Sequence, residues 1–287
     1  MPKRAALYEE LRDAAVVGAR AGARVLLGYF RAGDIQVREK GAYDLVSRAD
    51  HESEETVIAE IRRRFPDHHI LAEESGVSAG SSQYEWLIDP LDGTSNYVQG
   101  LPVFSVSVAC RHQGRVVAGA VLDPVGDNLF TAIAGGGAEW NGQPMRVSRR
   151  DRLAGGFLAT GYPFRARGAL ELYLDVFHDV FLEVRSIRRC GSAALDLAYT
   201  AAGVYDGFFE FRLSPWDFAA GVLLIREAGG CVTDLDGGDG FFASGNLVAG
   251  PLGLHEELLR IVRRHVDEAR LDEVDPVERA FVDLAVR

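Results

Sequence analysis

The sequence predicts a mixed protein of the α/β (α+β) class, in which helices and strands follow one another along a single chain. Three observations support this class. Apolar residues recur at helical spacing in several segments, short apolar runs of strand length lie between them, and glycine or proline marks most of the boundaries. With 287 residues, of which 47% are hydrophobic, the chain can form one large domain or two modest domains with a full core.

The N-terminal part is predicted to open with a long helix and to continue with several strands. Helical spacing of leucine, alanine and valine extends over residues 7–29, and a short strand is expected at 35–38. A second helix begins at Ser47, which forms the Ser-x-x-acid pattern of a capping box with Asp50. Further strands are expected at 70–72, 86–88, 104–111, 115–122 and 128–133, the last three as an antiparallel meander that ends in a glycine turn at 135–137.

The C-terminal part is predicted to alternate strands with helices. Ser214, Pro215 and Asp217 have the N-cap serine, N1 proline and N3 acid of a helix start, so the helix dipole favours the ionised form of Asp217. The segment 234–239 resembles a calcium loop only superficially and is expected to be a turn. Strands are expected at 157–160, 207–211, from 232 onward and at 247–250, and helices at 171–184, 191–203, 215–228 and 254–266.

The composition argues against several classes of function. The formal net charge of −11 disfavours a nucleic-acid-binding surface, and an acidic protein that handles a phosphate needs metal ions or N–H groups to offset the repulsion. The three cysteines, Cys110, Cys190 and Cys231, indicate neither a disulfide framework nor a zinc site, so a reducing, cytoplasmic compartment is expected. Neither a secretory signal nor a run of membrane-spanning length is expected.

The most informative segment is 89–94, Asp-Pro-Leu-Asp-Gly-Thr, which follows an apolar strand. Asp89 and Asp92 are three residues apart on a turn stiffened by proline, so both carboxylates and the carbonyl of Leu91 can point at one position. Gly93 allows a close approach of its backbone, and residues 93–96 can open a helical turn whose N–H groups face an anion. The same residues are also common in turns, so this segment alone leaves a purely structural interpretation open.

Other acids also stand at the ends of predicted elements. Glu73 follows the strand at 70–72, while Asp50 and Asp217 lie in first turns of helices. A set of oxygen ligands suits Mg²⁺, or Mn²⁺ as a substitute, better than metals that prefer thiolate or imidazole. The seven histidines form no ligand spacing, and His68 and His69 are expected in a surface loop.

These residues resemble the inositol monophosphatase family of lithium-sensitive, magnesium-dependent phosphatases. The resemblance rests on 73–75 (Glu-Glu-Ser), on 89–94 with Asn96, and on 216–217 (Trp-Asp) leading to 227–230 (Glu-Ala-Gly-Gly). It covers roughly residues 5–265, and 189–199 and 215–221 look most like a bacterial member of the family. One departure is Ala72, where a glycine often precedes the two glutamates.

The resemblance implies a layered sandwich of alternating helix and sheet layers. It further implies a single catalytic domain over residues 1–287, in which the halves 1–150 and 151–266 share the active site. Residues 267–287 have no counterpart, and an extra helix or a frayed tail are both open there. A homodimer is implied as well.

The resemblance also implies roles for individual residues. Glu73, Asp89 and the Leu91 carbonyl would hold a first Mg²⁺, and Asp89, Asp92 and Asp217 a second. A water activated by magnesium would lose its proton through the Thr94 hydroxyl paired with Asp50, so that Asp50, Thr94 and Glu73 are the expected catalytic residues. The expected substrate contacts are Asp92, Gly93, Thr94, Ser192, Ala193, Glu210 and Asp217.

Structural alternatives remain open for some of these residues. Asp50 is also a plain capping acid. Ser192, Ala193 and Glu210 also fit the ordinary composition of strand and helix ends.

The activity implied is hydrolysis of the small phosphate ester inositol 1-phosphate. A haloacid-dehalogenase-type phosphatase is disfavoured because its acids have the spacing Asp-x-Asp, whereas this chain has Asp-x-x-Asp. Fructose 1,6-bisphosphate, histidinol phosphate and 3′-phosphoadenosine 5′-phosphate remain alternative substrates. A protein partner in a transcription antitermination complex is a further alternative, but the complete set of metal acids favours an enzyme.

Overall fold

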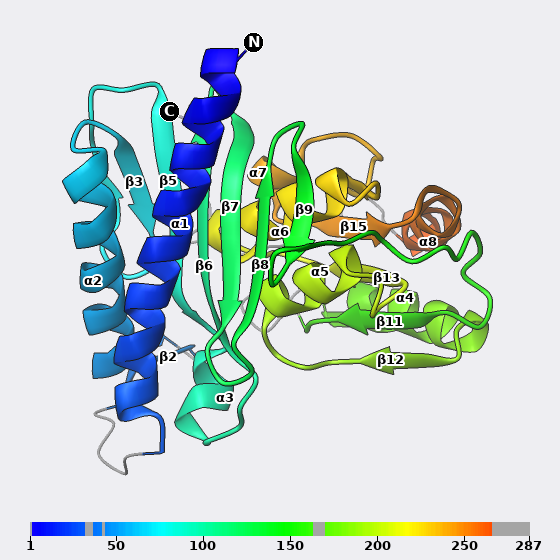
Figure 1. The fold of residues 1–287 in the computed structure, drawn as a ribbon. Helices are drawn as coiled ribbons and strands as arrows, with labels where there is room; N and C mark the ends of the chain where they lie inside the picture. Colours follow the sequence, from blue (N-terminus) through cyan, green and yellow to red (C-terminus); the bar gives the residue numbers. More distant parts are fainter. Residues whose placement is uncertain (1, 32–36, 42–43, 163–169, 266–287) are drawn as a thin grey trace.

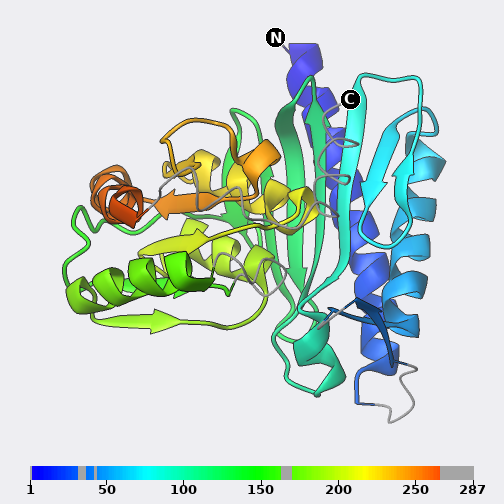
Figure 2. The same cartoon turned by 180° about the vertical axis from the view of Figure 1, so that it is seen from behind.

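The structure, a computed structural model, describes residues 2–31, 37–41, 44–162 and 170–265, and its helices and sheets alternate in layers (Figure 1). Helices α1 and α2 cover one face of a large sheet. Helices α5 and α6 lie between this sheet and a smaller one, and α4 and α8 cover the outer face of the smaller sheet (Figure 2). The expected layered α/β fold is therefore confirmed.

The elements of the N-terminal part follow the expected order with small shifts of their bounds. They are α1 (Pro2–Tyr29), β1 (Val37–Gly41), β2 (Asp44–Ser47), α2 (Arg48–Arg64), β3 (His69–Ala72), β4 (Gly76–Ser78), β5 (Tyr84–Asp92), α3 (Thr94–Val98), β6 (Ser105–His112), β7 (Arg115–Asp123), β8 (Asn128–Ile133), β9 (Gly137–Trp140) and β10 (Gln143–Pro144).

The elements of the C-terminal part also follow the expected alternation. They are β11 (Phe157–Thr160), α4 (Leu170–Glu183), β12 (Ser186–Arg188), α5 (Ala193–Ala201), β13 (Gly207–Glu210), α6 (Pro215–Glu227), β14 (Cys231–Thr233), α7 (Phe241–Ser244), β15 (Leu247–Gly250) and α8 (Leu252–His265).

The large sheet has the strand order β10-β9-β8-β7-β6-β5-β3-β4, and the small sheet has the order β12-β11-β13-β15-β14. The expected meander of β6, β7 and β8 is confirmed by antiparallel pairing. Parallel pairs join β3 to β5 and join β11 to both β12 and β13. The first two strands, β1 and β2, form a separate antiparallel pair.

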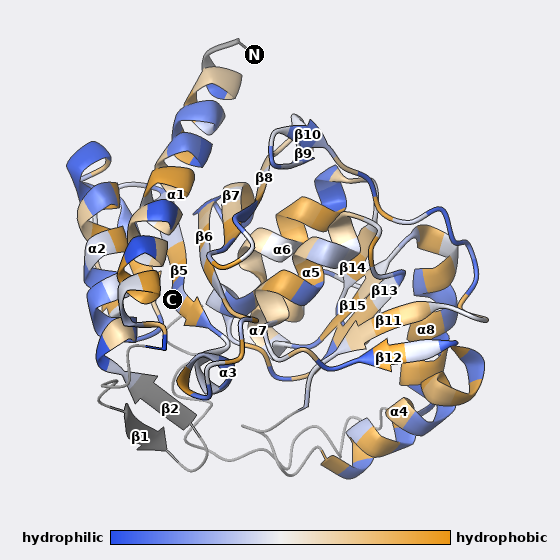
Figure 3. Cartoon of the chain, turned by 60° about the horizontal axis from the view of Figure 1, so that its bottom comes forward, coloured by the Kyte–Doolittle hydropathy of each residue, from blue (hydrophilic) through white to orange (hydrophobic). Residues whose placement is uncertain are grey.

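Side-chain alternation along the strands decides which residues face the space between the sheets. In β5, Trp86 and Ile88 pack toward α1 and α2, whereas Leu87 packs into the central core around α5 and α6. In β13, Phe208 packs into the same central core, and Phe209 faces α4 and α8. Figure 3 shows the apolar residues of α5 between the sheets. Asp89, two residues after Leu87, therefore begins the polar end of this central layer.

Strand β5 differs from the prediction at the residues that matter most. The sequence predicts that this strand stops at the start of the segment 89–94, but β5 continues to Asp92 through an irregularity in which Asp89 pairs with Ser107 and Asp92 with Ser105. Because the two residues between the acids have fewer partners on β6, the strand bulges there. The Leu91 N–H then donates to the Asp89 carboxylate at 3.0 Å.

Some short elements were not predicted, and one loop assignment was wrong. The unpredicted elements, β2, β4, β9, β10, β12 and α7, are two to four residues long, which is too short for a periodic signal. His68 was expected in a surface loop, but it is half-buried and stacked between Phe65 and Tyr84, and His69 begins β3. The expectations for residues 35–36, 42–43 and 266–287 lie outside the described residues.

Two further sequence expectations concern the turn at 234–239 and the cysteines. The Asp234 carboxylate accepts hydrogen bonds from the N–H groups of Asp236, Gly238 and Gly240, so this segment is a turn, as expected. All three cysteines are free thiols. In the part of the chain that the structure describes, no helix combines the length and apolar character needed to cross a bilayer.

The close packing of α5 against α6 depends on Gly221. A Cβ atom at this position would lie 2.5 Å from the Leu197 Cβ, which is closer than carbon atoms approach. We expect G221A to lower the free energy of unfolding by about 1–3 kcal/mol, because overpacking exceeds the roughly 1 kcal/mol of helix propensity that alanine gains. The matched control is G28A in α1, where a Cβ meets nothing within 4 Å and stability should be kept or raised. Urea unfolding of both variants checks this, and a G221A protein as stable as G28A would contradict it.

The stacked His68 predicts a loss of stability in acid. Its Nδ1 accepts the Trp86 indole N–H at 3.0 Å, and burial lowers the pKa of His68 below its ordinary 6.5. Because the unfolded chain binds this proton at higher pH, the stabilising contribution is complete above about pH 6.5 and is lost as the pH falls through the folded pKa. We expect acidification to lower the free energy of unfolding of the wild type by about 1 kcal/mol or less through this histidine. The H68F variant keeps the ring stacking but has no imidazole to protonate, so it should not show this loss. Urea unfolding at about pH 7.5 and about pH 5.5 measures the difference between the two proteins, and equal losses would refute the assignment.

Candidate active site

One pocket brings together acids from both parts of the chain. It is lined by the end of β5, the start of α3, the start of α5, the end of β13 and the start of α6. The lining includes Glu73, Asp89, Leu91, Asp92, Gly93, Thr94, Ser192, Ala193, Glu210 and Asp217. Of the residues expected to bind metal or substrate or to take part in catalysis, Asp50 alone does not line the pocket, but it contacts Thr94.

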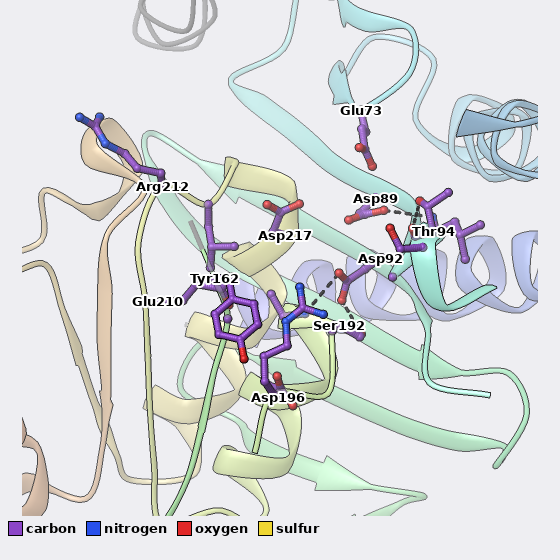
Figure 4. A pocket seen from close by; sticks show the side chains of 18 of the residues that line it. Glu73, Asp89, Asp92, Thr94, Tyr162, Ser192, Asp196, Glu210, Arg212 and Asp217 are labelled. Carbon is purple, nitrogen blue, oxygen red and sulfur yellow. Dashed lines mark hydrogen bonds between the residues drawn. The ribbon is translucent and has the colours of Figure 1, made fainter. Parts of the chain in front are cut away.

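Three carboxylates face the same space in this pocket. Figure 4 shows those of Glu73, Asp89 and Asp217 directed toward one region. Asp89 is almost completely buried, and its pKa is raised well above the ordinary range. Burial is the largest cause, and the negative charges of Glu73, Asp92 and Asp217 also raise this pKa. The crowding of these charges stabilises the protonated form of Asp89 and favours a bound cation.

Asp92 connects the large sheet to α5. Its carboxylate accepts hydrogen bonds from the Ser192 hydroxyl at 2.5 Å, from the Ala194 N–H at 2.8 Å and from the Ala193 N–H at 3.2 Å (Figure 4). Burial nevertheless raises the pKa of Asp92 to about 6, against the lowering effect of these bonds. Asp92 lies on a strand about one hundred residues earlier in the chain than α5. Its carboxylate therefore accepts hydrogen bonds from N–H groups in the first turn of α5 that have no partner within the helix.

Asp50 combines both interpretations that the sequence left open. Its Oδ2 accepts the Ser47 backbone N–H at 2.9 Å, which completes the expected capping box. Its Oδ1 lies 3.2 Å from the Thr94 hydroxyl, which is also 3.1 Å from the Leu91 carbonyl. Because the two oxygens have separate partners, the capping bond fixes the carboxylate and leaves the other oxygen for Thr94.

Asp217 is positioned by the start of α6. It accepts the Ser214 backbone N–H at 2.8 Å, in the expected capping arrangement with Pro215 at the first position. The aligned peptide dipoles of the helix favour a negative charge at this end.

The turn after Asp92 requires glycine. Gly93 has φ 99°, and a Cβ there would lie 3.0 Å from the Val103 carbonyl and 3.1 Å from the Gly191 carbonyl. The side chain of Asn96 donates to the carbonyls of Val103 and Cys190 at 2.7 and 2.8 Å. These contacts hold the start of α3 against the segment that leads into α5.

Glu210 lies at the far end of the pocket from Glu73. A Cβ at position 161 would lie 1.8 Å from the Glu210 Oε1, so Gly161 leaves the space that this carboxylate occupies. Burial raises the pKa of Glu210 well above its ordinary range. The negative charges of Asp196, Asp217 and Asp92 also raise this pKa, whereas the positive charge of Arg189 lowers it.

Sequence reasoning missed several pocket residues. Gly161, Tyr162, Arg189 and Asp196 line the pocket, and the Arg189 guanidinium lies 5.0 Å from the centre of the Tyr162 ring. The signal that could have found Asp196 is an acid at the fourth position of a helix that is otherwise apolar up to Tyr199. Tyr162 follows a strand and gives no comparable signal.

The donors of the pocket fit a hard divalent cation by their chemistry. Carboxylates and the Leu91 carbonyl are the oxygen ligands that Mg²⁺ and Mn²⁺ prefer. As placed, no three histidine, cysteine, aspartate or glutamate side chains within the described ranges lie close enough to hold one ion. Asp89, Asp92 and Asp217 are instead each held by protein donors.

Comparisons with known proteins identify relatives over most of the chain. A model of the inositol monophosphatase family matches residues 7–267. "Nus factor SuhB" of Pseudomonas aeruginosa is 45% identical over 251 residues, which are 86% of this chain and 93% of that protein. "Inositol-1-monophosphatase" of Mesorhizobium japonicum is 43% identical over 262 residues, or 91% of this chain and 97% of that protein.

Solved structures agree as well. The crystal structure of the extragenic suppressor protein SuhB from Bartonella henselae has a TM-score of 0.85 at 42% identity and covers 88% of this chain and 98% of its own. The inositol monophosphatase of Anabaena has a TM-score of 0.78 at 37% identity and covers 94% of this chain and 98% of its own. This chain therefore belongs to the inositol monophosphatase family.

Proposed function

We propose that this protein is a magnesium-dependent phosphomonoesterase and that inositol 1-phosphate is its substrate. The observation that carries the proposal is the convergence of Glu73, Asp89 and Asp217 on one space, beside the glycine turn at Gly93 and Thr94. A buried group of acids repels an anionic substrate unless cations lie between them, which is the arrangement of a metal-dependent phosphatase.

The proposed ligands are those implied by the sequence. Glu73, Asp89 and the Leu91 carbonyl would hold one Mg²⁺, and Asp89, Asp92 and Asp217 another, with Mn²⁺ as a possible substitute. When bound, the metal ions supply positive charge that stabilises the attacking and leaving oxygens of an in-line displacement.

The residues of the chain itself supply proton transfer and orientation. The Asp50 Oδ1, 3.2 Å from the Thr94 hydroxyl, accepts the proton that this hydroxyl relays from the attacking water. The N–H groups of Gly93 and Thr94 bind the phosphate oxygens. Ser192, Ala193 and Glu210 contact the alcohol part of the substrate from the other side of the pocket.

Inositol 1-phosphate is favoured by the name of the Mesorhizobium relative and by the family. Fructose 1,6-bisphosphate, histidinol phosphate and 3′-phosphoadenosine 5′-phosphate are the alternative substrates, because the same acids can serve each phosphate group. A cytoplasmic location is part of the proposal, in keeping with the free cysteines. A homodimer is proposed from the family alone.

A second function is favoured by the names of other relatives. The Pseudomonas protein and an Escherichia coli protein that is 43% identical over 264 residues are both named Nus factor SuhB. We infer a protein partner in a transcription complex as the second candidate function, which does not exclude catalysis. Direct binding of nucleic acid is disfavoured by the net charge of −11.

Replacement of Asp92 tests the metal assignment. We expect D92N to lower kcat/KM by on the order of 100-fold and to weaken magnesium binding, because one charged ligand is lost while the amide oxygen still accepts a bond from Ser192. Phosphate release and calorimetric titration with magnesium measure both effects. The control is D236N in the exposed 234–239 turn, which should behave as the wild type. Near-normal turnover in a folded D92N protein would reject the two-metal assignment.

The substrate is tested by magnesium-dependent phosphate release from inositol 1-phosphate and the three alternative esters in one panel. We expect the highest kcat/KM for inositol 1-phosphate. Preference for another ester would keep the phosphatase and replace the substrate. A lack of release from every ester would leave the transcription partner as the better candidate.

A further inference from the structure

Asp196 is a buried acid that the proposed mechanism does not use. It lies in the first turn of α5, is 2% exposed and lines the same pocket as Glu210 and Arg189. Figure 4 shows it on the side of the pocket away from Glu73. Within the described part of the chain, its Oδ1 is buried without any hydrogen-bond partner.

Local structure does not account for this carboxylate. A buried acid without donors is unfavourable, because it has lost its hydration and gained no hydrogen bond in return. Burial raises the pKa of Asp196, as does the nearby charge of Asp92, whereas Arg189 lowers it.

Asp123 shows how a structural aspartate looks in the same protein. It is also buried, at 8% exposure, but its carboxylate accepts the N–H groups of Val125 and Gly126 at 3.0 and 2.9 Å and the Asn128 side chain at 2.9 Å. Asp123 therefore stabilises a turn. Among the residues that the structure describes, the Asp196 Oδ1 has no donor, so it is left as an acceptor for a group that enters the pocket.

The neighbours of Asp196 define the chemistry of that group. Ser192 and Ala193, at the start of the same helix, are bonded to Asp92, so the helix runs from the acids of the metal site toward Asp196. Asp196 and Glu210 line the same pocket, and both lie on its side away from Glu73 (Figure 4). Two neighbouring acceptors at a distance from the phosphate position suit an alcohol that carries several hydroxyl groups.

We propose that Asp196 is a specificity-determining residue that accepts a hydrogen bond from a hydroxyl group of a polyhydroxylated alcohol, beside Glu210. The proposal rests on the phosphatase function proposed above and adds a residue that selects the alcohol. An ester whose alcohol lacks hydroxyl groups leaves Asp196 and Glu210 unpaired, and a site built for hydrogen bonds discriminates strongly against such an analogue.

The test compares inositol 1-phosphate with phenyl phosphate, whose alcohol carries no further hydroxyl group. The quantity measured is the ratio of kcat/KM for the two esters, in the wild type, D196L and D196N. We expect the ratio to fall about tenfold or more in D196L, mainly through KM for inositol 1-phosphate, and to fall less in D196N, which keeps one acceptor.

Stability provides the second readout. Because Asp196 has no hydrogen-bond donor to lose, we expect urea unfolding of metal-free D196L to show stability equal to or above that of the wild type. The matched control is D123N, which should be less stable than the wild type yet keep the wild-type ratio of esters.

The outcomes separate this inference from the proposed function. If both Asp196 variants keep wild-type turnover and an unchanged ratio of kcat/KM for the two esters, the role of Asp196 is overturned and the phosphatase function stands. The same conclusion follows if both variants lose stability but retain the ratio. Absence of magnesium-dependent release from either ester by the wild type would reject the phosphatase itself and, with it, the selection of an alcohol.

Discussion

The burial of several carboxylates beside one another is the constraint on which the rest of this structure depends. Asp89 is almost fully enclosed, and its environment includes the charges of Glu73, Asp92 and Asp217. Such a group of acids has an unfavourable energy in a folded chain unless hydrogen-bond donors or cations offset it. The surrounding fold supplies the hydrogen-bond donors, and the magnesium ions of the proposed phosphatase would supply the cations.

Backbone N–H groups at element ends are the main donors. The first turn of α5 donates to Asp92, the N-terminus of α6 to Asp217, and the bulge in β5 to Asp89. Since Asp92 belongs to the large sheet and α5 lies in the layer between the sheets, the pocket cannot form before these layers have packed together. The packing that builds the core therefore also builds the site.

Close approach of the backbone is the second requirement. Gly93 allows β5 to turn beside the carbonyls of Val103 and Gly191, and Gly161 leaves the space for the Glu210 side chain. The two sides of the pocket therefore differ. Acids that accept hydrogen bonds from the protein gather where a metal would lie. Asp196 lies on the other side, in the pocket that Glu210 also lines, and its Oδ1 has no hydrogen-bond partner among the described residues.

The sequence by itself determined the order of the elements, the central meander and the acids of segment 89–94, because periodicity, capping residues and turn residues are local signals. Only the tertiary structure decided that β5 continues to Asp92, that Asp50 serves both as a cap and as the partner of Thr94, and that His68 is stacked on aromatic rings. It also brought Asp196, Arg189 and Tyr162 into the pocket. These facts depend on contacts between segments far apart in the chain, and such contacts leave no pattern in the local sequence of either segment.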